Sequence, residues 1–372
     1  MKVALIHDHL AQDGGAEKVL KVLAEMFPDA VIYALLADKV KTEKYLKGRR
    51  IDTSIIQRLP GGVNHYKWYL PLMPMAVEFF DLREYDLVIS DTSSFAKGVI
   101  TSPDVPHICY CHTPTRYLWS DAHQYLNELK YNKWMKKVIS TILVRLRMWD
   151  FLASARVDHF IANSKTVQKR ITKYYRRDCE VIYPPVETEH FFISDLKTQE
   201  AEERYFLIGC RLVPYKRVDI VVEAFKKLGT DYKLKVFGDG LDLERLKEIA
   251  GEATNIEFLG RISDDEKAVL YSRAQAFINP QEEDFGITPV ESMASGRPVI
   301  AYRKGGVTET VIEGKTGLFF DEQTADAIAE VVRKFKSDDF NPEDIRAHAE
   351  TFSVARFEKE ITAFIDNVKN NK

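Results

Sequence analysis

The stretch EEDFGITPVESMASG, residues 282–296, carries two glutamates eight positions apart, Glu283 and Glu291. Between them, a Phe-Gly pair predicts a turn, and Thr288-Pro289 predicts the start of a helix with Thr288 as its N-cap. Glu291 stands three residues after Thr288, so it can close a capping box, and a ligand contact is the alternative. Glu283 lies in the loop before the turn and has no capping role. The pattern therefore favours a ligand contact for Glu283 and leaves both interpretations open for Glu291.

Two cations lie in a loop earlier in the chain. The apolar run FLIGC is followed by Arg211 and, five residues later, by Lys216. Both precede a helical pattern, VDIVVEAFKKL, and positive charge is unfavourable beside the positive N-terminal end of a helix dipole. This conflict indicates a negatively charged ligand, such as a diphosphate, that compensates the two cations. A solvated basic turn is the alternative.

A glycine pair, Gly14-Gly15, stands just before the helical pattern AEKVLKVLAEMF. Glycine lets the backbone approach a ligand, and the free N–H groups at a helix start favour an anion. An ordinary tight turn explains the pair equally well, because the G-x-G-x-x-G dinucleotide fingerprint is absent.

One histidine, His112, ends the apolar run HICYCH and directly precedes Thr113-Pro114. A histidine of the core is the usual interpretation. Its place at the carboxyl end of a predicted strand favours a ligand site instead, because ligands of open parallel sheets bind at that edge. His7 and His9, at the end of the first predicted strand, are further candidates of the same kind.

The elements that must position these residues alternate along the chain. Short apolar runs rich in Val, Ile and Leu are followed by segments in which apolar residues recur at helical spacing. Strands are expected at 2–8, 86–91, 107–112, 159–164, 276–280, 298–302 and 316–320, and strand-loop-helix units at 204–228, 234–250 and 256–274. Ser263 and Glu266 form a capping box for one of the helices. Strands that are apolar on both faces and alternate with helices predict an α/β fold with doubly wound parallel sheets.

The length of 372 residues exceeds one ordinary core and fits two domains. A hydrophobic fraction of 45% and a charged fraction of 29% are typical of a globular protein. The formal charge of −3 argues against a chain that coats nucleic acid. The polar stretch 187–203 is the expected linker, so the domains are expected at 1–186 and 187–352, with a last helix from about Ser353.

The four cysteines form neither a Cys-x-x-Cys motif nor a zinc-ligand pattern, which predicts reduced thiols of a cytosolic protein. The apolar run at the N-terminus is too short for a signal peptide. The sequence contains no stretch of 18 apolar residues, so no helix that spans a membrane is expected.

Residues 130–152 read as one helix with an apolar, Trp-containing stripe. Trp134, Val138, Ile142 and Trp149 recur at near-helical steps. Basic residues lie among them, namely Lys133, Lys136, Lys137, Arg145 and Arg147. This combination suits a peripheral contact with a membrane surface. A long helix packed on its domain, with a solvated basic side, is the alternative.

Together these segments resemble the retaining, nucleotide-sugar-dependent glycosyltransferases of family 4 (group 1), whose GT-B architecture has two facing Rossmann-like domains. DGGAEKVL resembles the glycine loop of the family, and GCRLVPYKRVD resembles its Gly-Arg…Lys diphosphate signature. EEDFGITPVESMASGRPVIA resembles its Glu-x7-Glu segment, which is the most specific match. CHTPTRYLW and YPPV are further similar to a bacterial subgroup that transfers mannose from GDP-mannose during polysaccharide assembly.

The resemblance extends over nearly the whole chain and departs from the family pattern at two positions. Arg217 follows Lys216 where the family usually has Gly, and Cys210 precedes Arg211 where a second small residue is common.

In the Glu-x7-Glu segment, the resemblance implies that Glu283 hydrogen-bonds hydroxyls of the donor sugar. Backbone N–H groups around Phe285, Gly286 and Ile287 would assist it. Glu291 would hold the ribose of the nucleotide.

In the other loops, the resemblance implies that Arg211 and Lys216 bind the diphosphate and stabilise its charge as it leaves. Gly14 and Gly15 would border the phosphates or the acceptor. His112 would bind the 6-hydroxyl of the reacting sugar. The helix from Ser353 onward would cross back and complete the first, acceptor-binding domain.

The implied partners are a nucleotide-sugar donor, GDP-mannose or alternatively a UDP-sugar, and a glycan or polyprenyl-diphosphate-linked acceptor at the inner face of the cytoplasmic membrane. The chain contains no Asp-x-Asp, so neither an obligatory metal nor a resident cofactor is expected. With Glu283 and Glu291 committed to the donor, no carboxylate is left as a base, which predicts that the leaving phosphate accepts the proton and that the anomeric configuration is retained. A sugar-nucleotide epimerase and a non-catalytic binding module are the alternatives.

Overall fold

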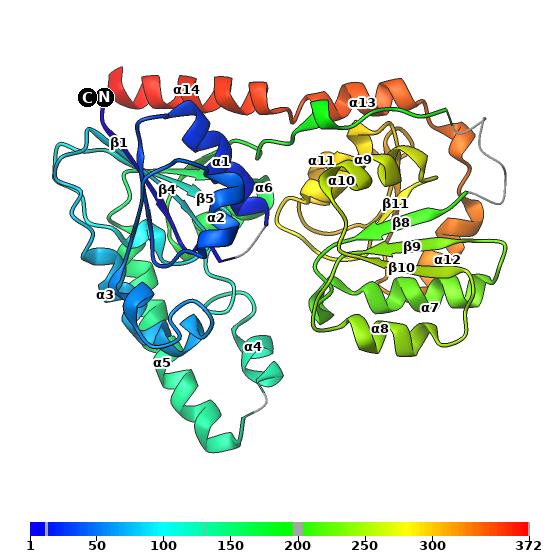
Figure 1. The fold of residues 1–372 in the computed structure, drawn as a ribbon, viewed down its shortest axis with the longest axis horizontal. Helices are drawn as coiled ribbons and strands as arrows, with labels where there is room; N and C mark the ends of the chain where they lie inside the picture. Colours follow the sequence, from blue (N-terminus) through cyan, green and yellow to red (C-terminus); the bar gives the residue numbers. More distant parts are fainter. Residues whose placement is uncertain (12–13, 130, 196–203, 371–372) are drawn as a thin grey trace. The chain divides into compact units, whose positions relative to one another are not determined.

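The computed structural model describes residues 1–11, 14–129, 131–195 and 204–370. These residues form two compact units (Figure 1). The first unit contains Met1–Tyr183 and the chain from Glu358 onward, and the second contains Pro184–Phe357. Of the expected linker, residues 196–203 lie outside the described residues.

The first unit is built on a seven-stranded parallel sheet with the order β3-β2-β1-β4-β5-β6-β7. Its strands are β1 Val3–His7, β2 Val31–Ala34, β3 Ile51–Thr53, β4 Leu87–Thr92, β5 His107–Cys111, β6 His159–Ala162 and β7 Cys179–Val181. Every residue of the central strands β1, β4 and β5 is buried. A sheet whose middle strands are covered on both faces is the doubly wound arrangement that the apolar runs predict.

The helices of the first unit follow these strands in the chain. They are α1 Gly15–Met26, α2 Lys39–Tyr45, α3 Met73–Glu78, α4 Ala122–Glu128, α5 Lys133–Ser154 and α6 Lys165–Tyr174, with short 3-10 segments η1 Ile55–Arg58, η2 Tyr66–Leu72 and η3 Ala96–Gly98. The helix expected at 130–152 is α5, which begins after its N-cap Asn132; residue 130 lies outside the described residues.

The second unit is built on a six-stranded parallel sheet with the order β10-β9-β8-β11-β12-β13. Its strands are β8 Phe206–Gly209, β9 Leu234–Phe237, β10 Ile256–Gly260, β11 Phe277–Asn279, β12 Val299–Tyr302 and β13 Gly317–Phe320. Its helices are α7 Val218–Leu228, α8 Leu243–Ala250, α9 Asp264–Arg273, α10 Ile287–Ala294, α11 Val307–Thr310, α12 Ala325–Lys334 and α13 Pro342–Glu350. The prediction of two doubly wound α/β domains is confirmed.

The last helix, α14 Val354–Asn370, begins in the second unit and continues as part of the first. Its buried side chains recur at helical spacing, at Phe357, Ile361, Phe364, Ile365 and Val368. The Phe364 ring packs edge-on against the ring of His159 in β6, with centroids 6.2 Å apart. The predicted C-terminal helix is therefore present, and most of it completes the first unit.

One predicted helix start is confirmed and another is wrong. Ser263 caps α9, and its capping box with Glu266 is formed. The expected cap at Thr288 is not formed: α10 begins at Ile287, two residues before the expected first residue Pro289, and its N-cap is Gly286 with φ +94°. Glycine adopts positive φ without strain, so the Phe-Gly turn runs directly into the helix and leaves Thr288 inside the first turn. Glu291 consequently closes no capping box with Thr288.

Candidate functional site

Three neighbouring strands of the second unit, β8, β11 and β12, end at the same edge of its sheet, because all are parallel. The loop after β8 carries Arg211 and Lys216, the loop after β11 carries Glu283, and the loop after β12 carries Gly305-Gly306. Loops from adjacent strands meet at this edge even though they lie up to 95 positions apart in the printed sequence. The predicted sugar and diphosphate residues of this unit therefore come from one edge.

At this edge the Lys216 ammonium forms an ion pair with Glu283 Oε1. The same oxygen accepts a hydrogen bond from Gln281 Nε2 at 2.9 Å. Both charged side chains are partly exposed, 16% for Lys216 and 18% for Glu283. Burial opposes the charge of Lys216, but Glu283 outweighs it and raises the pKa of the lysine. The pair is thus ionised, held in place, and still accessible from solvent.

A glycine pair lets the loop after β12 approach Glu283 closely. The Gly306 N–H donates to the Glu283 carbonyl oxygen at 2.8 Å. Gly305 has φ +79°, and a Cβ there would lie 2.3 Å from that carbonyl oxygen. A Cβ on Gly306 would lie 2.3 Å from the Asp284 oxygen. Any larger residue would push the two loops apart, so Gly305 and Gly306 help to fix the backbone of Glu283.

The loop after β8 holds its two cations differently. Arg211 is exposed, and its NH2 group lies 3.3 Å from the Tyr215 hydroxyl. Arg217, which replaces the usual glycine, adopts φ +53° and ψ +35° and precedes α7. Its guanidinium donates to Asp219 at 3.1 Å and to Gln323 at 3.2 Å. The glycine that the family usually has at this position would allow a left-handed backbone, and Arg217 adopts this conformation without being a glycine.

Glu291 is buried in the second unit, with its side chain 2% exposed. The Lys267 ammonium of α9 lies 3.1 Å from its Oε1 atom, and the Tyr271 hydroxyl lies 3.4 Å from its Oε2 atom. Burial and the charge of Glu291 raise the pKa of Tyr271 well above its usual value, so this hydroxyl keeps its proton. The ion pair with α9 takes the place of the expected capping role, and the ribose contact stays a prediction.

The start of α10 lies within the Glu-x7-Glu segment. Phe285 is buried and its ring packs 5.7 Å from that of Phe352, which fixes the turn. Gly286, as the N-cap, has no side chain that could satisfy the N–H groups of the first turn, beginning at Ile287. Backbone donors at this helix end are therefore available to an anion or a sugar hydroxyl.

In the first unit, Gly14 is the N-cap of α1 and Gly15 its first residue. The Gly14 N–H donates to Glu17 Oε2 at 3.0 Å, so a carboxylate already occupies one donor of this helix start. Residues 12 and 13, which precede it, lie outside the described residues. The proposed phosphate or acceptor contact of the pair stays a prediction.

His112 follows β5 and forms a hydrogen bond with Asp91 of β4, with 2.6 Å between Nε2 and Oδ1. The other oxygen of Asp91 lies 2.9 Å from Nδ1 of His7, at the end of β1. His9, the other early candidate, instead contacts the ring of Tyr66. The two histidines that frame Asp91 come from strands on either side of β4, which places them at one edge of the first sheet.

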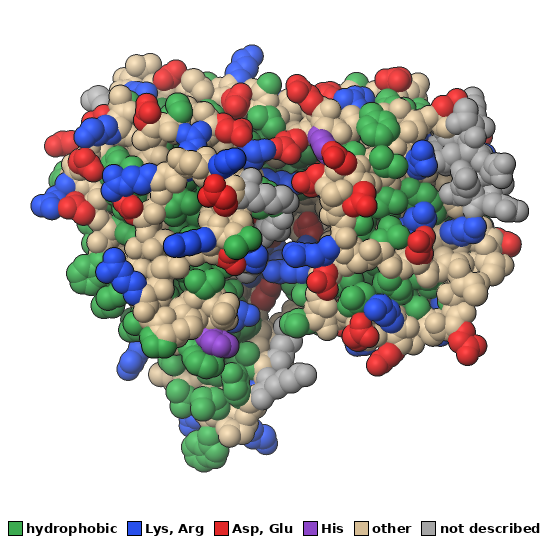
Figure 2. Space-filling model, viewed as in Figure 1, with side chains coloured by type: hydrophobic (Ala, Val, Ile, Leu, Met, Phe, Trp, Pro, Cys, Tyr) green, Lys and Arg blue, Asp and Glu red, His purple; other side chains and the backbone are tan. Residues whose placement is uncertain are grey.

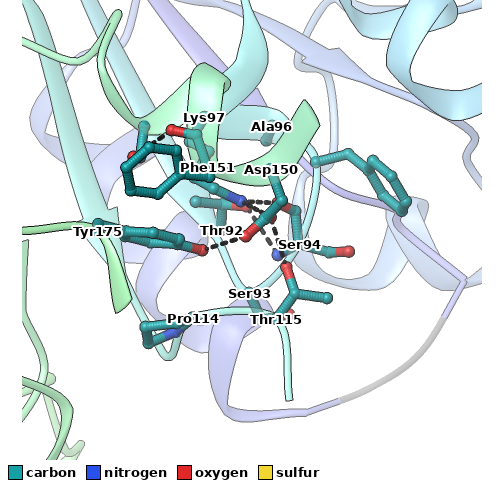
Figure 3. Close-up of polar contacts among 12 residues, drawn as sticks. Thr92, Ser93, Ser94, Ala96, Lys97, Pro114, Thr115, Asp150, Phe151 and Tyr175 are labelled. Atoms are coloured by element: carbon teal, nitrogen blue, oxygen red, sulfur yellow. Dashed lines mark hydrogen bonds and ion pairs between the residues drawn. The ribbon is translucent and has the colours of Figure 1, made fainter. Parts of the chain in front are cut away.

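The segment that follows His112 is held to α5 by hydrogen bonds to Asp150, which also forms a buried ion pair. Lys97 of η3 and Asp150 of α5 are each 1% exposed, and their charged atoms are 2.5 Å apart. Figure 3 shows Lys97, Thr115 and Tyr175 directed toward Asp150. Trp119 Nε1 also donates to Asp150, at 2.7 Å. This arrangement fixes the course of the CHTPTRYLW segment, and therefore the loop that begins at His112.

Four residues that support the candidate groups were not predicted from the sequence. Gln281 and Gly305-Gly306 support Glu283, and Asp91 supports His112. Asp91 ends the predicted strand DLVISD, and a charged residue at the carboxyl end of a buried strand was an available signal. Gln281 and the glycines offered no signal, because their roles depend on how the loops meet.

Two family models match adjacent parts of the chain. A model described as Glycosyltransferase Family 4 matches residues 13–190, and one described as Glycosyl transferases group 1 matches residues 191–352. Each model covers most of one α/β unit, and together they match residues 13–352, from the glycine loop to two residues before the start of α14.

Curated relatives support the same family. The chain is 32% identical over 180 residues to a GDP-mannose-dependent alpha-(1-6)-phosphatidylinositol monomannoside mannosyltransferase of Mycobacterium tuberculosis, a match covering 43% of this chain and 47% of the relative. It is 25% identical over 317 residues to alpha-1,3/1,6-mannosyltransferase ALG2 of Dictyostelium discoideum, covering 73% of this chain and 71% of the relative. The chain spans about half the length of curated relatives such as the mycobacterial one.

A solved structure shares the fold. The Anabaena protein Alr3699/HepE, in complex with UDP and glucose, superimposes with a TM-score of 0.73 at 20% sequence identity, covering 98% of this chain and 99% of that one. The two α/β units therefore have the GT-B fold, and the chain belongs to the group 1 glycosyltransferases of family 4.

Proposed function

We propose that this protein is a retaining hexosyltransferase that uses a nucleoside-diphosphate sugar as donor. The observation that carries the proposal is the accessible Lys216–Glu283 ion pair at the carboxyl edge of the second sheet. A cation and a carboxylate there match the two chemical parts of such a donor, a diphosphate and a sugar rich in hydroxyl groups.

Each group at this edge has a proposed role. Lys216 and Arg211 bind the diphosphate, Glu283 accepts hydrogen bonds from hydroxyls of the donor sugar, and the first N–H groups of α10 add further donors. Support comes from the exposure of Arg211 and the absence of a capping side chain at Gly286. Glu291 holds the ribose, which requires it to share its carboxylate between Lys267 and the ligand.

The proposed reaction is a front-face transfer. The bond between the anomeric carbon and the diphosphate oxygen breaks, and its electron pair stays on the phosphate. The acceptor oxygen bonds to the anomeric carbon on the same face and gives its proton to the leaving phosphate oxygen. Lys216 and Arg211 stabilise the negative charge that grows on the diphosphate. The product then keeps the anomeric configuration of the donor.

Mannose from GDP-mannose is the proposed donor. Two relatives named for mannosyl transfer support it, and one of them is named for GDP-mannose. The solved Anabaena protein, whose ligands are UDP and glucose, supports the alternative of a UDP-sugar. His112 is proposed to bind a hydroxyl of the transferred sugar.

The proposed acceptor is a glycan or a polyprenyl-diphosphate-linked saccharide, at the cytoplasmic face of a membrane. Apolar side chains are exposed on α5 at Trp134, Met135, Val138, Val144, Met148, Phe151 and Leu152, and on the adjacent η2–α3 segment at Trp68, Leu72, Met75 and Phe79. Lys133, Lys137 and Arg145 of α5 are also exposed, whereas Asp150, the one acidic residue of α5, is buried. Figure 2 shows hydrophobic side chains gathered over these elements, at the lower left. An apolar surface flanked by positive charge supports docking on anionic lipid.

None of the helices in the described ranges combines the length and the apolar character needed to cross a bilayer.

The donor is tested by thermal shift with GDP, UDP and ADP and their hexose conjugates, since a ligand of the native state raises its melting temperature. Proton NMR of the product made with the best donor then reads the anomeric configuration. An α-linked product from an α-donor is expected, and a β-linked product would overturn the mechanism. Isomerised donor in a reaction without acceptor would instead identify an epimerase.

Membrane docking is tested by co-sedimentation with vesicles that contain anionic lipid. Replacing Lys133, Lys137 and Arg145 by glutamate is expected to abolish binding. A control with the same charge change replaces Lys247, Lys334 and Lys336, which are exposed residues of the second unit. Equal binding by both triple variants would contradict the proposed surface.

A further inference from the structure

His7, Asp91 and His112 form a buried chain of polar contacts at the edge of the first sheet. β4 lies between β1 and β5, and the sheet register sets His7 directly beside Asp91. Asp91 in turn lies beside Tyr110 of β5, so His112, two residues further on, points to the same face of the sheet. The His112 N–H donates to the Thr92 carbonyl oxygen at 2.8 Å, which continues the ladder and holds the loop. The three side chains therefore meet because of strand register.

The carboxylate decides which nitrogens carry protons. Asp91 contacts Nδ1 of His7 with one oxygen, at 2.9 Å, and Nε2 of His112 with the other, at 2.6 Å. Although burial alone would favour the neutral acid, the two histidines lower the pKa of Asp91, so it is ionised and can only accept. Both contacting nitrogens must then be donors. The other ring nitrogen of His112 is Nδ1, and no residue in the described ranges forms a hydrogen bond with it.

The charge of Asp91 is compensated by His7. Burial opposes the charge of His7, but the hydrogen bond and charge of Asp91, with smaller contributions from Glu17 of α1 and Asp8, raise its pKa to about 9. His7 is therefore a cation at neutral pH, and His7 with Asp91 makes a pair without net charge. Besides Asp91, the ring that faces His112 is Tyr110, which contacts it edge-on at 5.4 Å. His112 is not required to carry a charge in order to balance Asp91.

We propose that His7 and Asp91 are positioning residues that hold His112 as the neutral Nε2–H tautomer, so that its Nδ1 accepts a hydrogen bond from a substrate hydroxyl. The side chain of His112 is 12% exposed, whereas those of Asp91 and His7 are 1% and 3% exposed. A small ligand can thus reach His112 but not the pair behind it. The hydroxyl contact rests on the proposed function, and the tautomer does not.

The tautomer is tested on the full chain without substrate, by long-range proton–nitrogen NMR of protein with 15N-labelled histidine. At pH 7, His112 is expected to show a protonated Nε2 and an unprotonated Nδ1, and His7 is expected to show both nitrogens protonated. His112 with a protonated Nδ1, in either charge state, would overturn the proposal. Because no activity is measured, failure of the proposed function leaves this result intact.

Two variants separate positioning from folding. His7→Gln keeps a donor beside Asp91 but removes the cation, so the 15N signals of the His112 ring are expected to shift. Asp91→Asn is expected to lose the tautomer preference and to reduce kcat about tenfold to a hundredfold, the usual weight of a charge-assisted hydrogen bond. The control is His107→Gln, because His107 is a buried histidine of β5 that bonds Ser90 instead. Unchanged His112 signals in His7→Gln and Asp91→Asn, or equal changes in the control, would contradict the proposed roles.

Discussion

The two units each contain an ion pair between a lysine and a carboxylate, and the two pairs differ in what surrounds them. Lys97–Asp150 is 1% exposed on both sides, and Asp150 also accepts hydrogen bonds from Thr115, Trp119 and Tyr175. Lys216–Glu283 is 16% and 18% exposed. Burial with many protein partners leaves a charge no capacity for a ligand, whereas partial exposure leaves it able to exchange partners. The comparison separates an ion pair that is buried in the fold from one that is accessible to a ligand and is proposed to bind substrate.

The largest effect is expected at the buried pair. Asp150→Asn leaves the ammonium of Lys97 without its counter-charge, and breaking a buried pair typically costs about 3–5 kcal/mol. The free energy of unfolding of the first unit should fall by this amount in urea titrations. A loss below about 1 kcal/mol would show that Lys97 finds another partner and that the pair does not hold the fold.

The next effect is a pH dependence that belongs to the first unit. The pKa of His7 is raised to about 9 in the folded state from 6.5 in the unfolded chain. Protonated His7 stabilises the folded state fully below pH 6.5, and this stabilisation is lost as the pH rises through 9. The free energy of unfolding should fall by about 3 kcal/mol between these two pH values. Unfolding free energies measured between pH 6 and 9.5 should show this decline, and His7→Gln should flatten it.

His107 provides the control for that window. Burial, with a contribution from Arg156, lowers its pKa to about 3, so it destabilises the fold only as the pH falls below 6.5. His107→Gln should therefore leave the decline between pH 6.5 and 9 in place. A decline that disappears in both variants would mean that another group of the first unit carries it.

Replacing the carboxylate of the exposed pair by an amide should lower activity much more than stability. Glu283→Gln keeps an oxygen for Lys216 and Gln281, and partly exposed ion pairs contribute only about 0–1 kcal/mol. Stability should therefore change by less than about 1 kcal/mol, while transfer should fall about a hundredfold because a charged acceptor for sugar hydroxyls is lost. Melting temperature and turnover measured together decide this. Full activity, or a stability loss as large as that of Asp150→Asn, would remove the distinction between the pairs.

The smallest effect is expected at Arg217, which is next to Lys216. Arg217→Gly relieves the left-handed backbone of a non-glycine residue but gives up hydrogen bonds to Asp219 and Gln323. The two contributions are each about 1 kcal/mol and have opposite signs, so the melting temperature should change little. Nucleoside-diphosphate affinity, measured by calorimetry, should stay within about threefold. A large loss of affinity would place the Arg217 side chain on the ligand.

Much of the fold follows from the sequence because strand and helix periodicities are strong in this chain. The buried strands β1, β4, β5 and β8 contain runs of apolar residues, and their alternation with helical segments along the chain predicts parallel sheets. That inference also explains why the contact of Lys216 with Glu283, from separate loops, could be expected at one sheet edge. These features can be predicted because the strand and helix patterns depend on residues that are close together in the chain.

The predictions that fail, or were not made, depend on geometry that near neighbours do not determine. The sequence allows a helix to start after either Gly286 or Thr288, and the positive φ of Gly286 allows the earlier start that the structure has. Asp91 reads as the last residue of a strand until register sets it beside His7. Asp150 reads as one residue of an amphipathic helix, because its partner Lys97 lies 53 positions earlier in the chain.

The course of α14 has a consequence for how the protein is made. The second unit is inserted between Tyr183 and Glu358 of the first, so β1 and most of α14 both belong to the first unit (Figure 1). A ribosome therefore releases the closing helix of the first unit only after the whole second unit has been synthesised. Until then the nascent first unit lacks the apolar face of α14 that completes its core. The second unit is therefore the part that can complete its fold first.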